Sequence, residues 1–328
     1  MRMMDLPKLF ILDVAHGNCA ILQDTEGTVI IDCAHGDTLI ETLRQLNVNY
    51  VDRIIISHAD EDHVKGFIDL LSDESIKIGH IYINPDGSKK TRTWTNLRRL
   101  ITEAVDKKET TRNFIYAGLT GLEVGEVKIE ILAPNMDIVG QAGGLDLDNQ
   151  SLNSNSVSVV VRLIYRDQGI ALLAGDIDQI GLKNLLNSGN DISSKVLVFP
   201  HHGGNVGTKD NQSFTSSLCQ KVQPQMVVFS IGRDKHSNPR KEVVEAVTDS
   251  LPDVHIICTQ LAKTCSPEVL STTPEHLNIL PSKGKEANHC CGGTVVINLS
   301  ETEMTYAPSN DHRQFVKENI VSALCMRS

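Results

Sequence analysis

The sequence predicts an α+β fold in which two packed, mixed β-sheets are flanked by helices, an αββα sandwich. Short β-branched and apolar runs recur along the 328 residues, and Gly, Asp, Asn and Pro bound them, as is typical of strands. Many runs follow one another directly, with helical patterns after only some of them, which favours two stacked sheets over a strict βαβ array. A hydrophobic content of 40% is enough to bury such a core.

The individual elements follow from the same patterns. Strands are predicted at residues 8–14, 28–33, 53–58, 77–83, 127–132, 157–165, 170–175, 195–200, 225–232, 254–259 and 293–299. Apolar residues at helical spacing predict helices at 37–47, 61–73, 95–108, 179–188 and 239–251. Loops are expected at Asn153–Ser156 and at 262–292. Residues 1–300 are predicted to form one domain, and residues 301–328 a C-terminal extension, a strand and a helix, packed on that domain.

Composition limits the environment and the partners. No apolar run approaches the roughly 18–20 residues needed to cross a bilayer, and no signal-peptide pattern is present, so a cytoplasmic protein without membrane association is expected. In that compartment the eight cysteines would be free thiols or metal ligands. A net charge of −10 opposes sequence-independent binding to a polyanion, so any contact with nucleic acid would be local. Protein partners are not predicted.

The segment HADEDH, between a predicted strand and a predicted helix, is the main functional signal. It places four potential metal ligands within six residues: His58, Asp60, Asp62 and His63. Two divalent cations could use all four side chains. The alternative is an acidic helix start that complements the helix dipole, which leaves the two flanking histidines unexplained.

Three later segments also end an apolar run with a possible ligand. Asp176 follows ALLAG, His201 and His202 follow VLVFP, and His236 follows FSIGRDK. Strand ends are where a sandwich collects distant residues at one edge. Each segment alone is a common turn or surface pattern, and their occurrence together is what indicates a site.

HADEDH, AGD and FPHHGG, in this order and spacing, resemble the metallo-β-lactamase superfamily, whose first motif is HxHxDH. The resemblance extends over about residues 8–300, and LDVAHGNCAIL is similar to the opening LDVGQGDAILI of the ComEC-type subgroup of competence proteins. It implies the metallo-β-lactamase αββα fold and a dinuclear site, usually of zinc or manganese. For the ComEC-type domain it implies a nuclease that acts on DNA.

The resemblance also implies roles for individual residues. His58 and Asp60 would bind one ion, Asp62 and His63 the other, Asp176 would bridge both, and His202 would complete the metal ligands. His201 would face the substrate as a phosphate contact or proton donor, with His236 as a late histidine of the site. Asp62, His201 and His236 are thus the predicted catalytic residues. Asp60 replaces the second histidine of the commoner motif, which shifts the preference from zinc toward manganese.

The predicted reaction is phosphodiester hydrolysis by a metal-bridged hydroxide. Residues 89–112 support a nucleic-acid or nucleotide substrate, because they hold eight basic and three acidic residues in an acidic chain. The alternative is a solvated helix face. Trp94 would stack on a base or pack the segment down. The predicted substrate-binding residues are His16, Asn18, Asn155, Ser156, Lys89, Lys90 and Arg92, and Asn155 could also supply a missing ligand.

Two other functions stay open. One is hydrolysis of a small phosphodiester, ester, thioester or lactone, which a narrow pocket would favour. The other is an inactive metal-binding regulatory module, against which the complete set of aspartates and histidines argues.

A second cluster comprises Cys258, Cys265, His289, Cys290 and Cys291. Buried free thiols are the expected state of these cysteines, and the alternative is an additional structural zinc at Cys258, Cys265 and Cys290.

Overall fold

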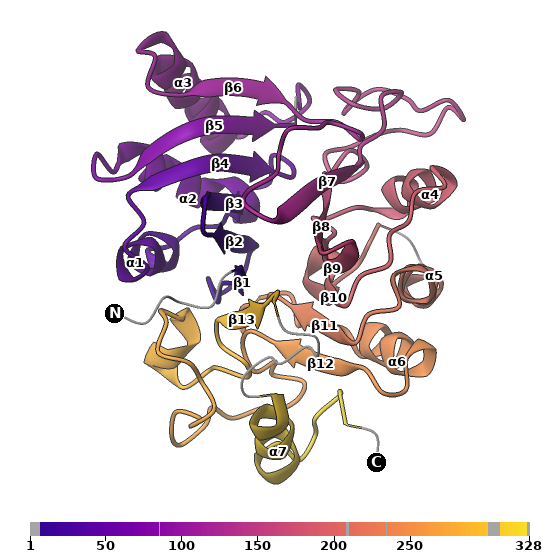
Figure 1. Ribbon diagram of the computed structural model, residues 1–328. Helices are drawn as coiled ribbons and strands as arrows, with labels where there is room; N and C mark the ends of the chain where they lie inside the picture. The colour runs from indigo at the N-terminus through magenta and orange to yellow at the C-terminus, as the bar shows by residue number, and fades with distance from the viewer. Residues whose placement is uncertain (1–6, 85, 208–209, 234, 301–308, 327–328) are drawn as a thin grey trace.

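A computed structural model describes residues 7–84, 86–207, 210–233, 235–300 and 309–326. Two mixed sheets pack face to face, and helices cover both outer faces, so the predicted αββα sandwich is confirmed (Figure 1). Within the described part of the chain, no helix is long and apolar enough to cross a membrane.

The first sheet has seven strands and the second has six. In spatial order, the first contains β13 (Val295–Asn298), β1 (Lys8–Ile11), β2 (Cys19–Asp24), β3 (Gly27–Cys33), β4 (Tyr50–Ile56), β5 (Lys77–Ile83) and β6 (Thr111–Phe114). The second contains β12 (His255–Cys258), β11 (Met226–Phe229), β10 (Val196–Val198), β9 (Gln168–Leu173), β8 (Val160–Tyr165) and β7 (Val127–Ala133). Strands β3 to β6 and β9 to β12 run parallel, and the other neighbours are antiparallel.

Helices lie on the outer face of each sheet (Figure 1). The first sheet is covered by α1 (Thr38–Gln45), α2 (Glu61–Ser72) and α3 (Arg92–Asp106), and the second by α4 (Gln179–Asn187), α5 (Asn211–Val222) and α6 (Lys241–Ser250). Short 3₁₀ helices occupy Pro200–Gly203 and Lys283–Ala287, and α7 (Ser309–Asn319) lies near the C-terminus.

The alternation of side chains along each strand builds three apolar layers. On β3, Val29 and Ile31 pack between the sheets, while Ile30 packs against the helices of the first sheet. This follows from the two-residue period of a strand, which sends successive side chains to opposite faces. Because both faces of each sheet are covered, central strands such as β10 and β11 are apolar on both faces.

Each predicted strand and helix range overlaps an observed element, whereas β2, β6 and α5 lie outside the predicted ranges. Strand β6 has the polar sequence TRNF at the edge of the first sheet, so no apolar run marks it. Helix α5 is rich in Ser and Thr, which are weak helix formers. Its buried Phe214 and Leu218, four residues apart, were the available signal.

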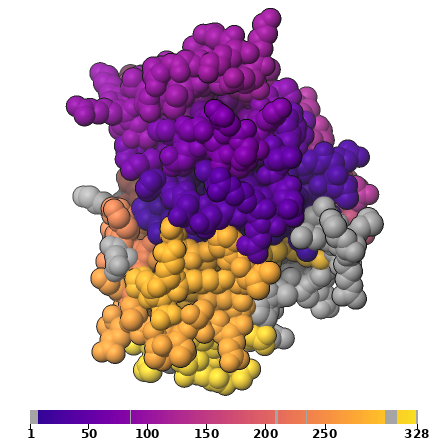
Figure 2. Space-filling model, turned by 90° about the vertical axis from the view of Figure 1, so that its left-hand side faces the viewer, coloured from indigo at the N-terminus to yellow at the C-terminus, as the bar shows by residue number. Residues whose placement is uncertain are grey.

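The C-terminal part packs on the second sheet. Val316 and Ile320 are buried in the same cluster as Ile256 of β12 and Val244 of α6. Residues 301–308, where the appended strand was expected, lie outside the described residues. The long tract between β12 and β13, coloured orange, borders the purple N-terminal half on the face in Figure 2.

Candidate metal centre

The turn between β4 and α2 positions four predicted ligands. His58 and Asp60 lie on the turn, whereas Asp62 and His63 lie on the first turn of α2. The carboxylate of Asp60 does not cap the helix and instead pairs with the ammonium group of Lys89.

Two groups of side chains each bring three donor atoms within 4.8 Å of one another. The first group, all buried, consists of His58, His63 and Asp176, and the second of His16, Asp62 and His202. In the second group, Nε2 of His16 and Nε2 of His202 both lie 3.3 Å from Oδ2 of Asp62. This division differs from the one implied by the resemblance, which placed Asp60 with His58, and His63 with Asp62.

Asp176 faces both groups. Its Oδ1 lies 3.4 Å from Nε2 of His63, and its Oδ2 lies 3.8 Å from Nε2 of His202. The chain reaches this position through Gly175, whose φ is +54° and where a Cβ would lie 2.5 Å from Oγ of Ser158. Glycine is therefore required immediately before the carboxylate.

Hydrogen bonds on the far side of each ring orient three histidines. Nδ1 of His63 donates to Oδ2 of Asp32 at 2.7 Å. Nδ1 of His202 donates to the carbonyl of Ser230 at 2.7 Å, because a carbonyl can only accept. Nδ1 of His58 lies 3.0 Å from Oγ of Ser57, which donates its own proton to Asp32. These contacts direct the Nε2 lone pairs toward the interior of the site.

Asp32 and Ser57 were not predicted as site residues. Asp32 is 2% exposed, near the end of β3, and also accepts the backbone N–H of Ser57 at 2.7 Å. The available signal was a carboxylate inside the apolar strand TVIIDC, which needs polar partners when buried.

The donor set fits divalent cations. Nε2 of His58, of His63 and of His202 are buried and have no hydrogen-bond partner within the described chain. An unsatisfied buried polar atom costs about 1–3 kcal/mol, so three facing one space indicate a group that they bind. Imidazole and carboxylate are ligands that zinc and manganese accept.

The electrostatics of the site favour a positive charge. Burial lowers the pKa of His58 to about 4, and the charge of His63 adds to that effect. Burial also acts to lower the pKa of His63, but Asp176 and Asp32 raise it well above its usual value. Burial would raise the pKa of Asp62, but the adjacent imidazoles of His16 and His202 hold it far below its usual range. The carboxylates therefore stay ionised and stabilise a cation.

His201 and His202 occupy a strained turn. Their φ angles are +50° and +55°, a left-handed conformation that is uncommon for residues other than glycine. The backbone N–H of His201 donates to Oδ1 of Asp176 at 3.0 Å, and its buried Nε2 has no hydrogen-bond partner within the described chain. Strain of this kind concentrates at functional sites.

His236 borders the second group from an exposed turn. Its ring centroid lies 4.8 Å from that of His16, and its φ is +54°. The side chain of the nearby Asn238 donates to the carbonyl of His201 at 3.4 Å, so this turn contacts the His201 turn.

The predicted substrate-binding residues occupy different surroundings. Lys89 pairs with Asp60 at the site, and Lys90 and Arg92 are exposed on the same segment. Asn18 is buried, and its backbone N–H donates to the carbonyl of Asp62 at 3.1 Å.

Asn155, Ser156 and Trp94 differ in their contacts. Oδ1 of Asn155 is buried without a hydrogen-bond partner in the described residues, whereas the hydroxyl of Ser156 donates to Asp178, the N-cap of α4, at 2.7 Å. Trp94 is 2% exposed, and its Nε1 donates to the carbonyl of Asp86 at 3.0 Å. Of the two roles left open for Trp94, packing is therefore the observed one.

Comparison with known proteins is consistent with this geometry. Residues 12–134 match the family model described as "Metallo-beta-lactamase superfamily". These residues form a metallo-β-lactamase superfamily domain. The fold agrees, because the metallo-beta-lactamase fold protein YhfI from Bacillus subtilis superposes with a TM-score of 0.51 at 10% identity, over 77% of this chain and 96% of that one. The metallo-β-lactamase fold is a metallohydrolase fold and implies divalent metal ions, for which the two donor groups supply sites.

Two curated relatives are similar to this chain. ComE operon protein 3 of Bacillus subtilis (strain 168) is 22% identical over 63% of this chain and 23% of its own length. Competence protein ComA of Neisseria gonorrhoeae is 25% identical over 71% of this chain and 27% of its own length. The chain thus spans about a quarter of the length of these relatives.

Proposed function

We propose that this chain is a dinuclear metal-dependent hydrolase that cleaves phosphodiester bonds, with nucleic acid or a nucleotide as substrate. The observation that carries the proposal is Asp176, whose two oxygens face separate groups of donors. A carboxylate that faces both groups could serve two cations. His58, His63 and Asp176 would hold one ion, and His16, Asp62 and His202 the other. Asp60, with Oδ1 4.0 Å from Nε2 of His58, stays a proposed donor to the first.

Two divalent cations, when bound, lower the pKa of water toward neutrality and offset charge on phosphoryl oxygens. The protein supplies orientation and proton transfer. Asp32 and Ser57 hold the imidazoles of His63 and His58 in one orientation. His201, with Nε2 unengaged, is the proposed proton donor to the leaving oxygen, a role worth about 10²–10⁴ in rate. His236 is a second candidate for the same role.

The proposed preference for phosphodiesters rests on the basic residues beside the site. Lys89, next to Asp60, with the exposed Lys90 and Arg92, would attract a phosphate backbone by local charge. The resemblance to the ComEC-type subgroup, which implies a nuclease that acts on DNA, makes DNA the first polymer to test. The cytoplasmic location stays a prediction.

The test is hydrolysis by the purified chain, with manganese and separately with zinc. Substrates are single-stranded DNA, duplex DNA, RNA and bis(p-nitrophenyl) phosphate. Asp62→Ala removes a proposed ligand on α2, and Asp69→Ala, an exposed aspartate on the same helix, is the matched control. Metal-dependent cleavage of a polymer that is lost in Asp62→Ala and retained in Asp69→Ala supports a nuclease.

Variants of the basic residues test whether the substrate is a polymer or a small molecule. Lys90→Ala and Arg92→Ala are expected to raise KM for a polymer several-fold, while KM for the small diester stays unchanged. Arg99→Ala is the control, since Arg99 on the same segment pairs with Glu103. Cleavage of only the small diester would indicate a small-molecule substrate. Metal binding without hydrolysis of any of these substrates would contradict phosphodiester chemistry.

A further inference from the structure

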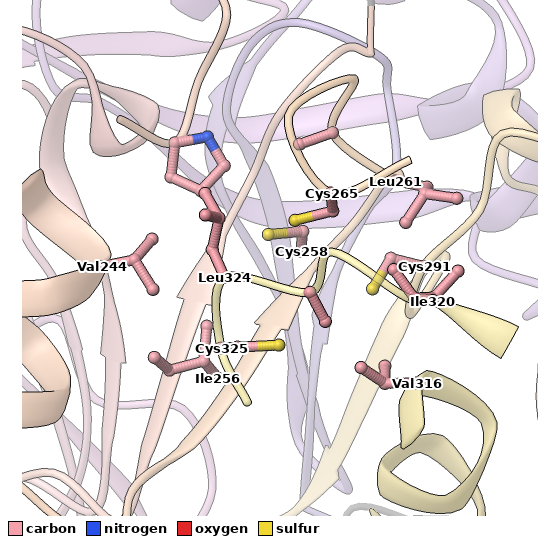
Figure 3. A pocket seen from close by; sticks show the side chains of 13 residues that line it. Val244, Ile256, Cys258, Leu261, Cys265, Cys291, Val316, Ile320, Leu324 and Cys325 are labelled. Carbon is pink, nitrogen blue, oxygen red and sulfur yellow. The ribbon is translucent and has the colours of Figure 1, made fainter. Parts of the chain in front are cut away.

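A second cluster of potential metal ligands lies on the outer side of the second sheet, beneath α7. Four cysteines from separate segments line one small cavity (Figure 3). Cys258 ends β12, Cys265 lies in the following loop, Cys291 precedes β13, and Cys325 follows α7. None of them belongs to either histidine–aspartate group.

The cavity is apolar apart from the sulfur atoms. Its volume is about 20 Å³, and the other lining residues include Val244, Ile256, Leu261 and Val316. A space of this size holds about one water-sized sphere. Four thiols around one such space match the ligand number of a structural zinc site.

We propose that Cys258, Cys265, Cys291 and Cys325 bind one divalent cation that prefers thiolate ligands, such as zinc. The bound cation would link residues 259–294 and the C-terminal tail to β12. Binding replaces four S–H bonds with four metal–sulfur bonds, releases four protons to solvent and changes no oxidation state. This site is independent of the proposed hydrolytic function.

Groups around the sulfurs suit thiolates. Nε2 of His312 lies 3.3 Å from Sγ of Cys291, where an N–H would stabilise a coordinated sulfur. The buried guanidinium of Arg233 donates to the carbonyls of Leu261, Ser266 and Pro267, in the loop that carries Cys265. A nearby fixed cation offsets the negative charge that four thiolates leave on a zinc complex.

Cation binding would draw the cysteines closer. Among the described residues, only the histidine–aspartate groups already hold three donor atoms within 4.8 Å. Cys325 lies after α7 and outside both sheets, so its sulfur can approach the ion without a shift of a strand.

The adjacent Cys290 belongs elsewhere. Its Sγ lies 3.3 Å from Oγ of Ser282 and 3.7 Å from Oδ2 of Asp13, and it does not line the cavity. In place of the alternative set of Cys258, Cys265 and Cys290, the proposed set therefore contains Cys291 and Cys325. Of the adjacent cysteines Cys290 and Cys291, only Cys291 lines the cavity.

The experiment is a cadmium titration of the reduced, full-length protein. Cadmium bound to thiolates gives an ultraviolet charge-transfer band that histidine and aspartate ligands do not give. One saturable cadmium–thiolate site per chain is expected for the wild type and for Cys290→Ser, the matched control. Cys258→Ser/Cys291→Ser, which lacks two of the four ligands, is expected to lose the band.

A second measurement needs no variant. An organomercurial reagent should release one zinc per chain from the purified wild-type protein, because it displaces metal from thiolates and not from imidazoles. The proposal is overturned if no thiolate band appears, if the band persists in Cys258→Ser/Cys291→Ser, or if the organomercurial releases no zinc. It is also overturned if thiol counting shows these cysteines oxidised in pairs to disulfides.

Discussion

Replacing Asp32 with asparagine tests the orientation of the metal ligands without touching a proposed ligand. Asp32 accepts three hydrogen bonds: from the backbone N–H and the hydroxyl of Ser57 at 2.7 and 2.8 Å, and from Nδ1 of His63 at 2.7 Å. Asparagine has nearly the same shape, but one of its two terminal atoms is a donor. It therefore cannot accept all three bonds.

Either placement of the amide has a cost. If the NH₂ group faces His63, the imidazole must shift its proton to Nε2, which removes the lone pair aimed at the site. If the NH₂ group faces the backbone N–H of Ser57, two donors meet, at about 1–3 kcal/mol for the unsatisfied group. Loss of an orienting partner weakens metal affinity about 10–100-fold, which corresponds to about 1.4–2.8 kcal/mol.

The measurement is the zinc or manganese Kd of Asp32→Asn by competition with a chromophoric chelator. Asp24→Asn is the matched control, because Asp24 is also buried and accepts backbone N–H groups of Thr25 and Glu126 at the turn between β2 and β3, the opposite end of this hairpin. Asp24→Asn should keep the wild-type Kd. A folded Asp32→Asn protein with a Kd within about twofold of the wild type would refute the reasoning.

Three further predictions concern the scaffold of the site. Gly66→Ala should lower the free energy of unfolding by about 1–3 kcal/mol in urea titrations, because the added Cβ would lie 2.1 Å from the backbone oxygen of Ala34; unchanged stability would contradict this contact. Asp86 keeps a pKa below the usual value because hydrogen bonds from Ser154 and Ser88 outweigh burial, which acts to raise it. It should therefore stabilise the fold above about pH 4 and lose that effect as pH falls further, so the difference in unfolding free energy between wild type and Asp86→Asn should shrink on acidification. Trp94→Phe should lower the free energy of unfolding by about 1 kcal/mol, because the hydrogen bond of Nε1 is lost, and should leave the affinity for a polymer unchanged. Weaker polymer binding at equal stability would instead support a role of Trp94 in base stacking.

Much of the fold was predictable because apolar runs and turn residues act locally. The strand ending at Ile56 and the helix beginning at Glu61 follow from patterns within a few residues. Strand β6 and helix α5 escaped prediction because neighbours in the sheet and core, rather than their own sequences, stabilise them.

The sequence indicated most of the residues that the structure brings together at the candidate site, but not the two groups into which they fall. The sequence by itself determined that His58, Asp62, His63, Asp176 and His202 are ligand types delivered by strand ends and by the first turn of α2. Which of them share a space depends on the register of strands far apart in the chain. Only the tertiary structure placed His16 with Asp62 and His202, and Asp32 behind His63.

For the cysteines too, the sequence indicated the residue types and the tertiary structure decided their grouping. Spacing along the chain could not distinguish Cys290 from Cys291, because one residue of register reverses the direction of a side chain. Nor could it include Cys325, which reaches the cavity only because α7 packs on the second sheet. The sequence determined the local elements and the types of ligand, since these depend on neighbouring residues. Tertiary structure decided the ligand groups, since these depend on contacts between distant segments.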